Sequence, residues 1–168
     1  MSASNSYEVI EPPSDLRSKV KVLTGRQAAE FDPVARAEQA LTRMSVSFPL
    51  WMNEEVETLS STHKEAKAAG FKGEATENFY RSAHNLRGQA ATMGFPVVGN
   101  TAGLVCELIE ARGEEELPAA LIASIIQAVR AMVREDAKGL SNEMAAALFS
   151  ELRGLTASEV ARLEAAQE

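Results

Sequence analysis

The sequence predicts an all-α fold: an antiparallel four-helix bundle with an extra N-terminal helix and a C-terminal helical extension. Three observations favour this class. Apolar residues recur at the three- and four-residue spacing of amphipathic helices, in segments of roughly 16 to 22 residues. The connections between these segments are short, which makes sequential helices run antiparallel. Aromatic residues make up 5% of the chain and alanine is abundant, so slim helices are favoured over a broad β-core.

Proline and glycine mark where the expected helices begin and end. Residues 1–27 are polar, lack sustained periodicity and are expected to form a flexible arm. The bundle domain is expected over residues 28–140, where Asp32 caps the leading helix and Pro33 opens it. A single long helix kinked at Pro49 is the alternative to two helices at that point. The expected helices span 33–47, 49–70, 74–93, 96–112 and 117–138.

Residues 141–168 are expected to form the C-terminal helical extension. Ser141 can cap a helix that ends near Arg153. Thr156 and Glu159 have the spacing of a capping box, in which each side chain accepts a hydrogen bond from the other residue's backbone N–H. The sequence therefore predicts two helices in this extension.

Charge and composition argue against nucleic-acid and membrane partners. The net charge of −7 and the pI near 5.0 would repel a phosphate backbone, and no local basic patch offsets them. The longest apolar stretch, Leu117–Val129, is shorter than the roughly 20 residues that span a bilayer. The single Cys106 cannot form an intramolecular disulfide, and the N-terminus lacks a secretory signal pattern. We therefore expect a cytoplasmic protein.

The segment AHNLRGQAATMG, Ala83–Gly94, belongs to a helix with two different faces. His84, Arg87, Gly88 and Ala91 recur at helical spacing and point away from the apolar stripe, so His84 is predicted to face water. A lone histidine is more often a buried structural residue, but this periodicity argues against burial. The apolar stripe, which is expected to face the core, consists of Phe79, Ala83, Leu86, Ala90 and Met93.

An exposed imidazole with a glycine one turn later suits a phosphoryl carrier. Glycine in a helix interior costs about 1 kcal/mol relative to alanine, so its presence needs another reason. Without a side chain, Gly88 lets a second macromolecule bring its reactive group up to the His84 ring. Arg87 adds a guanidinium that can pair with phosphate oxygens.

These residues resemble the pattern of the histidine-containing phosphotransfer (HPt) domains of two-component phosphorelays. The pattern has leucine at +2 from the histidine, a basic residue at +3, glycine at +4, small residues at about +5 to +7, a large apolar residue at +9 and glycine at +10. The likeness covers roughly residues 50–138. It departs from the family at +5, where Gln89 replaces a small residue, and at +3, where arginine replaces the commoner lysine. The matching positions are His84, Leu86, Arg87, Gly88, Gln89–Ala91, Met93 and Gly94.

The resemblance implies that His84 is the phosphoacceptor, through Nε2, and that Arg87 stabilises the phosphoryl group. The phosphoryl group would come from the aspartate of one receiver domain and pass to the aspartate of another, in a hybrid histidine kinase or a response regulator. The chain would be a phosphotransfer intermediate without autonomous ATP-dependent kinase activity. It would bind no cofactor or metal itself, because Mg²⁺ is expected in the partner receiver domain.

The expected docking surface surrounds the histidine. An apolar patch with positive charge would suit an acidic receiver pocket. Gln89 is a candidate to orient the His84 ring through a hydrogen bond. The surface is expected to consist of Tyr80, Arg81, Arg87, Gly88, Ala91 and Phe95.

Two other interpretations of the function stay open. One is an HPt-like helical module that binds and regulates a signalling partner without being phosphorylated. The other is the dimerisation and phosphoacceptor part of a kinase-like protein, although a monomer is favoured over a dimer.

His63 lies among polar neighbours and is expected to be an ordinary exposed residue. Cys106 is expected in the core rather than as a nucleophile, and no spacing of ligands suggests zinc.

Overall fold

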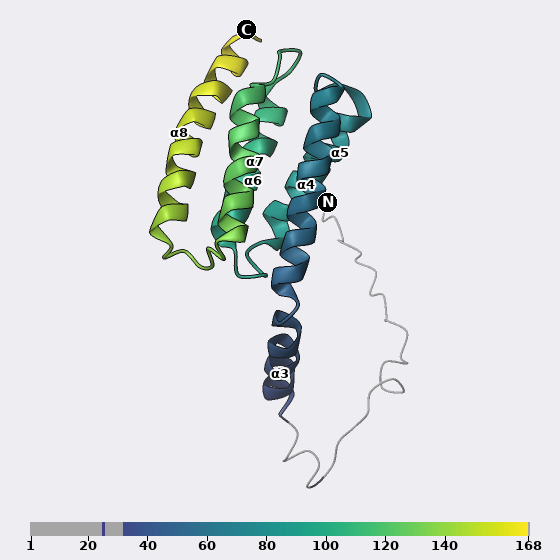
Figure 1. Cartoon of the computed structure of the whole chain (residues 1–168), viewed down its shortest axis with the longest axis vertical. Coiled ribbons are helices and arrows are strands. Elements are labelled where there is room, and N and C mark those ends of the chain that lie inside the picture. The colour runs from purple at the N-terminus through teal and green to yellow at the C-terminus, as the bar shows by residue number, and fades with distance from the viewer. Residues whose placement is uncertain (1–24, 26–31, 168) are drawn as a thin grey trace, which may run out of the picture. The chain divides into compact units, whose positions relative to one another are not determined.

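The computed structural model describes Gly25 and residues 32–167 of the chain. The flexible arm expected over residues 1–27 lies, apart from Gly25, outside the described residues. The described part contains six α-helices and no strand, which confirms the all-α class (Figure 1). The helices are α3 Pro33–Ser45, α4 Phe48–Ala68, α5 Gly73–Gln89, α6 Pro96–Ala111, α7 Ala119–Arg134 and α8 Glu143–Ala165.

The chain divides into two compact units, Met1–Leu41 and Thr42–Glu168. Helix α3 begins in the first unit and ends in the second, and none of its residues is buried. Its predicted start is confirmed. Asp32 Oδ1 accepts hydrogen bonds from the backbone N–H groups of Val34, at 2.9 Å, and Ala35, at 3.0 Å. The chain then forms two helices rather than one kinked helix, because a turn separates Ser45 from Phe48.

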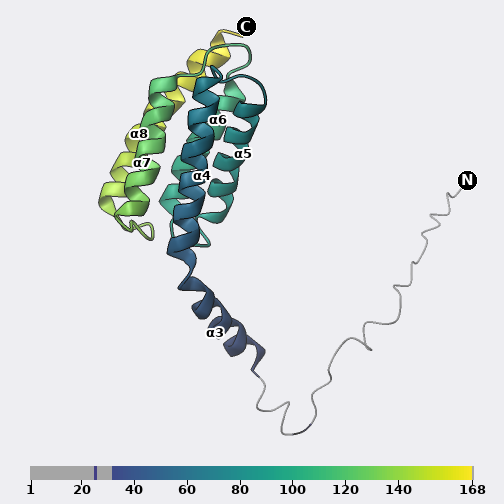
Figure 2. The same ribbon diagram turned by 45° about the vertical axis from the view of Figure 1, so that its right-hand side comes forward.

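Helices α4 to α8 lie side by side in the second unit (Figure 2). Contacts join α4 to α5, α5 to α6, α6 to α7 and α7 back to α4. Helix α8 packs against α6 and α7, and among the described residues it contacts neither α4 nor α5. Helix α6 has ten buried residues because it is packed against α5, α7 and α8. None of the helices in residues 32–167 combines the length and the apolar composition needed to cross a bilayer.

Helix α5 ends at Gln89, four residues before the expected end at Met93. The chain then forms a tight turn, in which the N–H of Phe95 donates to the carbonyl of Ala90 at 2.8 Å. Gly94 has a φ of +91°, a left-handed conformation that glycine adopts without a steric penalty. The turn therefore closes where the sequence predicts, although the regular helix ends earlier.

The C-terminal residues form one helix, so the prediction of two helices is wrong. Asn142, not Ser141, provides the cap, since its Oδ1 accepts from the N–H of Ala145 at 2.9 Å. Helix α8 continues through Thr156, which is fully buried rather than at a helix start. Leu152 and Leu163 are buried on the same side. Burial of this apolar stripe outweighs the local capping signal.

Candidate functional site

The two faces of α5 are arranged as the sequence predicts. Of the apolar stripe, Met93 is half-buried and the four preceding members are fully buried. The opposite face carries His84, Arg87, Gly88 and Ala91, all of which are exposed. The predictions that His84 faces water and that the stripe faces the core are therefore confirmed.

The surface beside His84 is open at Gly88. A Cβ atom built on Gly88 would meet no other heavy atom within 4 Å, apart from its own helical neighbours. Because Gly88 lies one turn after His84, the space next to the imidazole is free for a group from another molecule.

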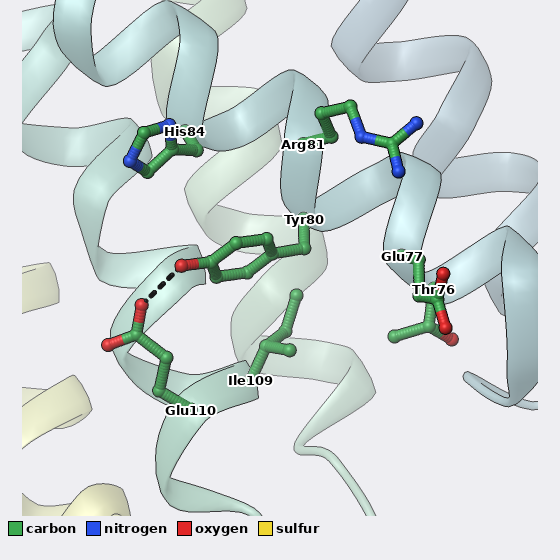
Figure 3. Close-up of a pocket in the computed structure, with 7 residues that line it drawn as sticks. All are labelled: Thr76, Glu77, Tyr80, Arg81, His84, Ile109 and Glu110. Atoms are coloured by element: carbon green, nitrogen blue, oxygen red, sulfur yellow. Dashed lines mark hydrogen bonds between the residues drawn. The ribbon is translucent and has the colours of Figure 1, made fainter.

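The His84 ring lies beside the ring of Tyr80. The two ring centroids are 6.0 Å apart and the ring planes differ by 25°, which is a stacked arrangement. The Tyr80 hydroxyl donates a 2.6 Å hydrogen bond to Oε1 of Glu110 on α6 (Figure 3). This hydrogen bond is the largest cause that raises the pKa of Tyr80, and it keeps the phenol protonated. Tyr80 is thus fixed at its far end and offers a flat surface to the imidazole.

No hydrogen bond to the His84 ring is present in the part of the chain that the structure describes. Gln89, the expected orienting residue, is exposed, and it lies five positions along α5, about 140° around the helix from His84. The neighbour that restricts the imidazole is the Tyr80 ring instead. Both ring nitrogens are therefore available to a partner.

A groove of about 550 Å³ runs between α5 and α6 next to His84. In Figure 3 the Arg81 side chain extends away from the imidazole, and its Nη1 is 3.5 Å from Oδ1 of Asn78. Arg81 is exposed, as expected, but its guanidinium does not lie beside the His84 ring. The groove is lined by Thr76, Glu77, Tyr80, Arg81, His84, Ile109 and Glu110.

Arg87 lies where α5 meets α6. It is exposed, and within residues 32–167 it has no ion pair. Its aliphatic stem passes over Gly103 of α6. The guanidinium charge is therefore not neutralised by a carboxylate of this surface, although Glu107 and Glu110 lie on the same helix as Gly103.

Phe95 is not part of the docking surface, which corrects the prediction. It is 1% exposed, because the turn after α5 directs it into the core. The Nζ of Lys138 lies 5.6 Å from the centroid of its ring and covers it. The other expected surface residues are accessible: Tyr80 is half-buried, and Arg81, Arg87, Gly88 and Ala91 are exposed.

His63 is buried, so the prediction of an ordinary exposed residue is wrong. It is 8% exposed, and its ring forms a cluster with those of Phe79, at 5.3 Å, and Phe71, at 6.2 Å, which also contact each other. Burial, with a smaller effect of the Lys67 charge, lowers the pKa of His63. Its Nε2 has no hydrogen-bond partner, so the neutral ring is the form that fits this site. The helical spacing of the buried residues Met52, Val56, Leu59, His63 and Ala66 could have predicted this position.

Cys106 is buried in α6, as expected. Desolvation is the main cause that raises the pKa of its thiol to about 11, so the thiolate needed for nucleophilic attack is disfavoured. In the described residues, no group of three or more His, Cys, Asp or Glu side chains is placed to bind a metal ion.

Two residues of the site were not singled out from the sequence. Glu110 has no signal in the sequence, and only its hydrogen bond from Tyr80, which joins α5 to α6, identifies it as part of the site. Gly103 has a sequence signal, since Gly99 precedes it by one helical turn and the two small residues share a face of α6.

A comparison with protein-family models, curated proteins and solved structures gives no match for this chain.

Proposed function

We propose that this chain is a histidine phosphotransfer protein, which relays a phosphoryl group between the aspartates of receiver domains. The observation that carries the proposal is the exposed His84 imidazole with unoccupied space at Gly88 one turn later. The resemblance of the surrounding residues to the HPt pattern supports the same function.

We also propose that α4, α5, α6 and α7 form an antiparallel four-helix bundle of the HPt type, with α8 added to one side. The contacts that join these four helices in a closed ring support this arrangement. The short connections between them support the antiparallel order.

In the proposed reaction the neutral imidazole of His84 attacks with the lone pair of Nε2 while Nδ1 holds the proton. The N–P bond forms as the bond between phosphorus and the aspartyl oxygen breaks, and the aspartate leaves as a carboxylate. Transfer to the second receiver reverses these steps. The receiver supplies Mg²⁺ for the phosphoryl oxygens. On this chain, Tyr80 restricts the ring and the unpaired Arg87 neutralises negative charge.

The test is incubation with purified receiver domains phosphorylated on aspartate. Wild-type protein is expected to acquire a label that is labile to acid and stable to alkali, as a phosphohistidine is. His84→Gln is expected to remove the label without loss of helical content. His63→Gln is the matched control, because His63 is the only other histidine of the chain, and it is expected to keep the label if it folds.

Label that persists in His84→Gln contradicts the proposal. Receivers that bind the wild-type protein without labelling it would favour the non-phosphorylated regulatory module instead.

A further inference from the structure

The stem of the Arg87 side chain lies over Gly103 of α6. A Cβ atom built on Gly103 would lie 3.3 Å from Cδ, 3.6 Å from Nε and 3.7 Å from Cγ of Arg87. Apart from the chain neighbours of Gly103 and the backbone of its own helix, the three nearest atoms to this Cβ all belong to the Arg87 side chain. The absence of a side chain at Gly103 therefore leaves a notch on α6 that the stem of Arg87 fills.

Gly99, one turn earlier on α6, has a different neighbour. A Cβ atom built there would lie 3.0 Å from the backbone carbonyl oxygen of Arg87 and 3.3 Å from Cβ of Ala90. Gly99 thus allows the backbones of α5 and α6 to approach closely. Gly103 accommodates only a side chain, which can move without moving a helix.

The notch holds Arg87 on the side of α5 where the reactive ring is supported. Arg87 lies one turn from His84, and Tyr80, whose ring stacks on His84, also faces α6. The guanidinium is near enough to the Tyr80 phenol and the Cys106 thiol to lower the pKa of both, against the larger effects that raise them. The stem of Arg87 therefore follows the α5–α6 boundary, and its exposed guanidinium stays accessible to a group from another molecule.

We propose that Gly103 is a positioning residue, which holds the Arg87 guanidinium beside His84 for contact with the phosphoryl group and acts only through Arg87. This inference rests on the proposed phosphotransfer function. A methyl group at position 103 would lie 3.3 Å from Cδ of Arg87, so the stem would have to shift by a few tenths of an ångström, since the flexible side chain yields more readily than the helix backbone.

The first experiment measures phosphoryl transfer from a phosphorylated receiver to wild type, Gly103→Ala, Arg87→Ala and the double variant. Gly103→Ala is expected to slow transfer by about tenfold, as expected for a charged hydrogen bond that is no longer positioned. In the Arg87→Ala background the same change is expected to have no further effect. Gly154→Ala, at an exposed glycine of α8 with open space around it, controls for alanine in a helix and is expected to transfer at the wild-type rate.

The second experiment does not depend on phosphotransfer or on the folding of a variant. NMR relaxation of the arginine Nε–H bonds in the wild-type protein is expected to show Arg87 more ordered than Arg81, which is also exposed, on the nanosecond timescale. Equal order in the two side chains overturns the inference.

The failures of the inference and of the proposed function are distinguishable. If no receiver labels the wild-type protein, the proposed function fails. If labelling occurs but Gly103→Ala transfers at the wild-type rate, or slows transfer equally with and without Arg87, the positioning role of Gly103 fails alone.

Discussion

The two histidines of the chain lie on neighbouring helices in opposite environments. His63 of α4 is buried against two phenylalanine rings, and its Nε2 has no partner. His84 of α5 is exposed, lies against one tyrosine ring and has open space at Gly88. The residue type is the same, but only His84 can be reached by another molecule. The comparison shows that the side of the helix on which a histidine lies decides whether its ring is buried in the core or exposed to solvent.

The largest difference between these regions is expected in stability. Phe79→Ala removes a fully buried ring next to His63 and is expected to cost about 3–5 kcal/mol in the free energy of unfolding. His84→Ala on the opposite face is expected to change it by less than about 0.5 kcal/mol. Urea denaturation measures both values. A large loss in His84→Ala would show that the exposed ring also supports the fold.

The buried histidine is expected to make stability depend on pH. Because the pKa of His63 is lower in the folded state than its ordinary value of 6.5, the unfolded state binds the proton more readily. The contribution of the neutral ring is complete above pH 6.5 and is lost as the pH falls through the lower, folded-state pKa.

Unfolding in urea at pH 7.5 and at several lower pH values checks this dependence. His63→Leu, which has no titrating group and no unpaired nitrogen, is expected to flatten the pH dependence in this range. An unchanged pH profile in His63→Leu would assign the dependence to other groups.

Alanine substitutions at the exposed glycines of α5 and α8 distinguish an effect on helix stability from an effect on docking. Gly88→Ala and Gly154→Ala both place a methyl group in open space, so each is expected to stabilise the protein by about 0.5–1 kcal/mol. Only Gly88→Ala is expected to slow labelling by a phosphorylated receiver, because its methyl group occupies the space beside His84. Thermal denaturation and transfer rates measure the two effects. Equal transfer rates in the two variants would show that the opening at Gly88 is not used.

The smallest effect is expected at Tyr80. Tyr80→Phe loses the hydrogen bond to the exposed Glu110 but keeps the ring beside His84, so stability is expected to change by less than about 0.5 kcal/mol and transfer to be retained. Tyr80→Ala loses the ring and is expected to transfer more slowly. If Tyr80→Phe transfers as slowly as Tyr80→Ala, the hydroxyl and not the stacked ring is what the site requires.

Local signals in the sequence predicted most of the fold and the exposed face of α5. Asp32 caps a helix as expected, and Gly94 closes the turn after α5. The spacing around His84 was sufficient to place it in solvent. These features depend on residues close together in the chain, where capping, backbone conformation and helical periodicity determine the structure.

Features that depend on packing between distant residues were missed. Thr156 resembles a helix start, but its burial on the core side of α8 keeps the helix continuous. His63 has polar neighbours in sequence, yet its position on the buried stripe of α4 places it in the core. Phe95 was assigned to the surface because the direction of the turn before α6 could not be derived from its residues. The contact of Arg87 with Gly103 joins two helices and has no local signal on α5.

The position of α8 has a consequence for how a partner would reach the His84 ring in the proposed function. Because α8 packs only on α6 and α7, no helix of the unit Thr42–Glu168 has to swing aside before another folded domain meets α5. The proposed phosphoryl exchange would then proceed as a collision of two preformed surfaces, without a slow opening step. Its speed would be governed by diffusion and by the ionic strength of the medium.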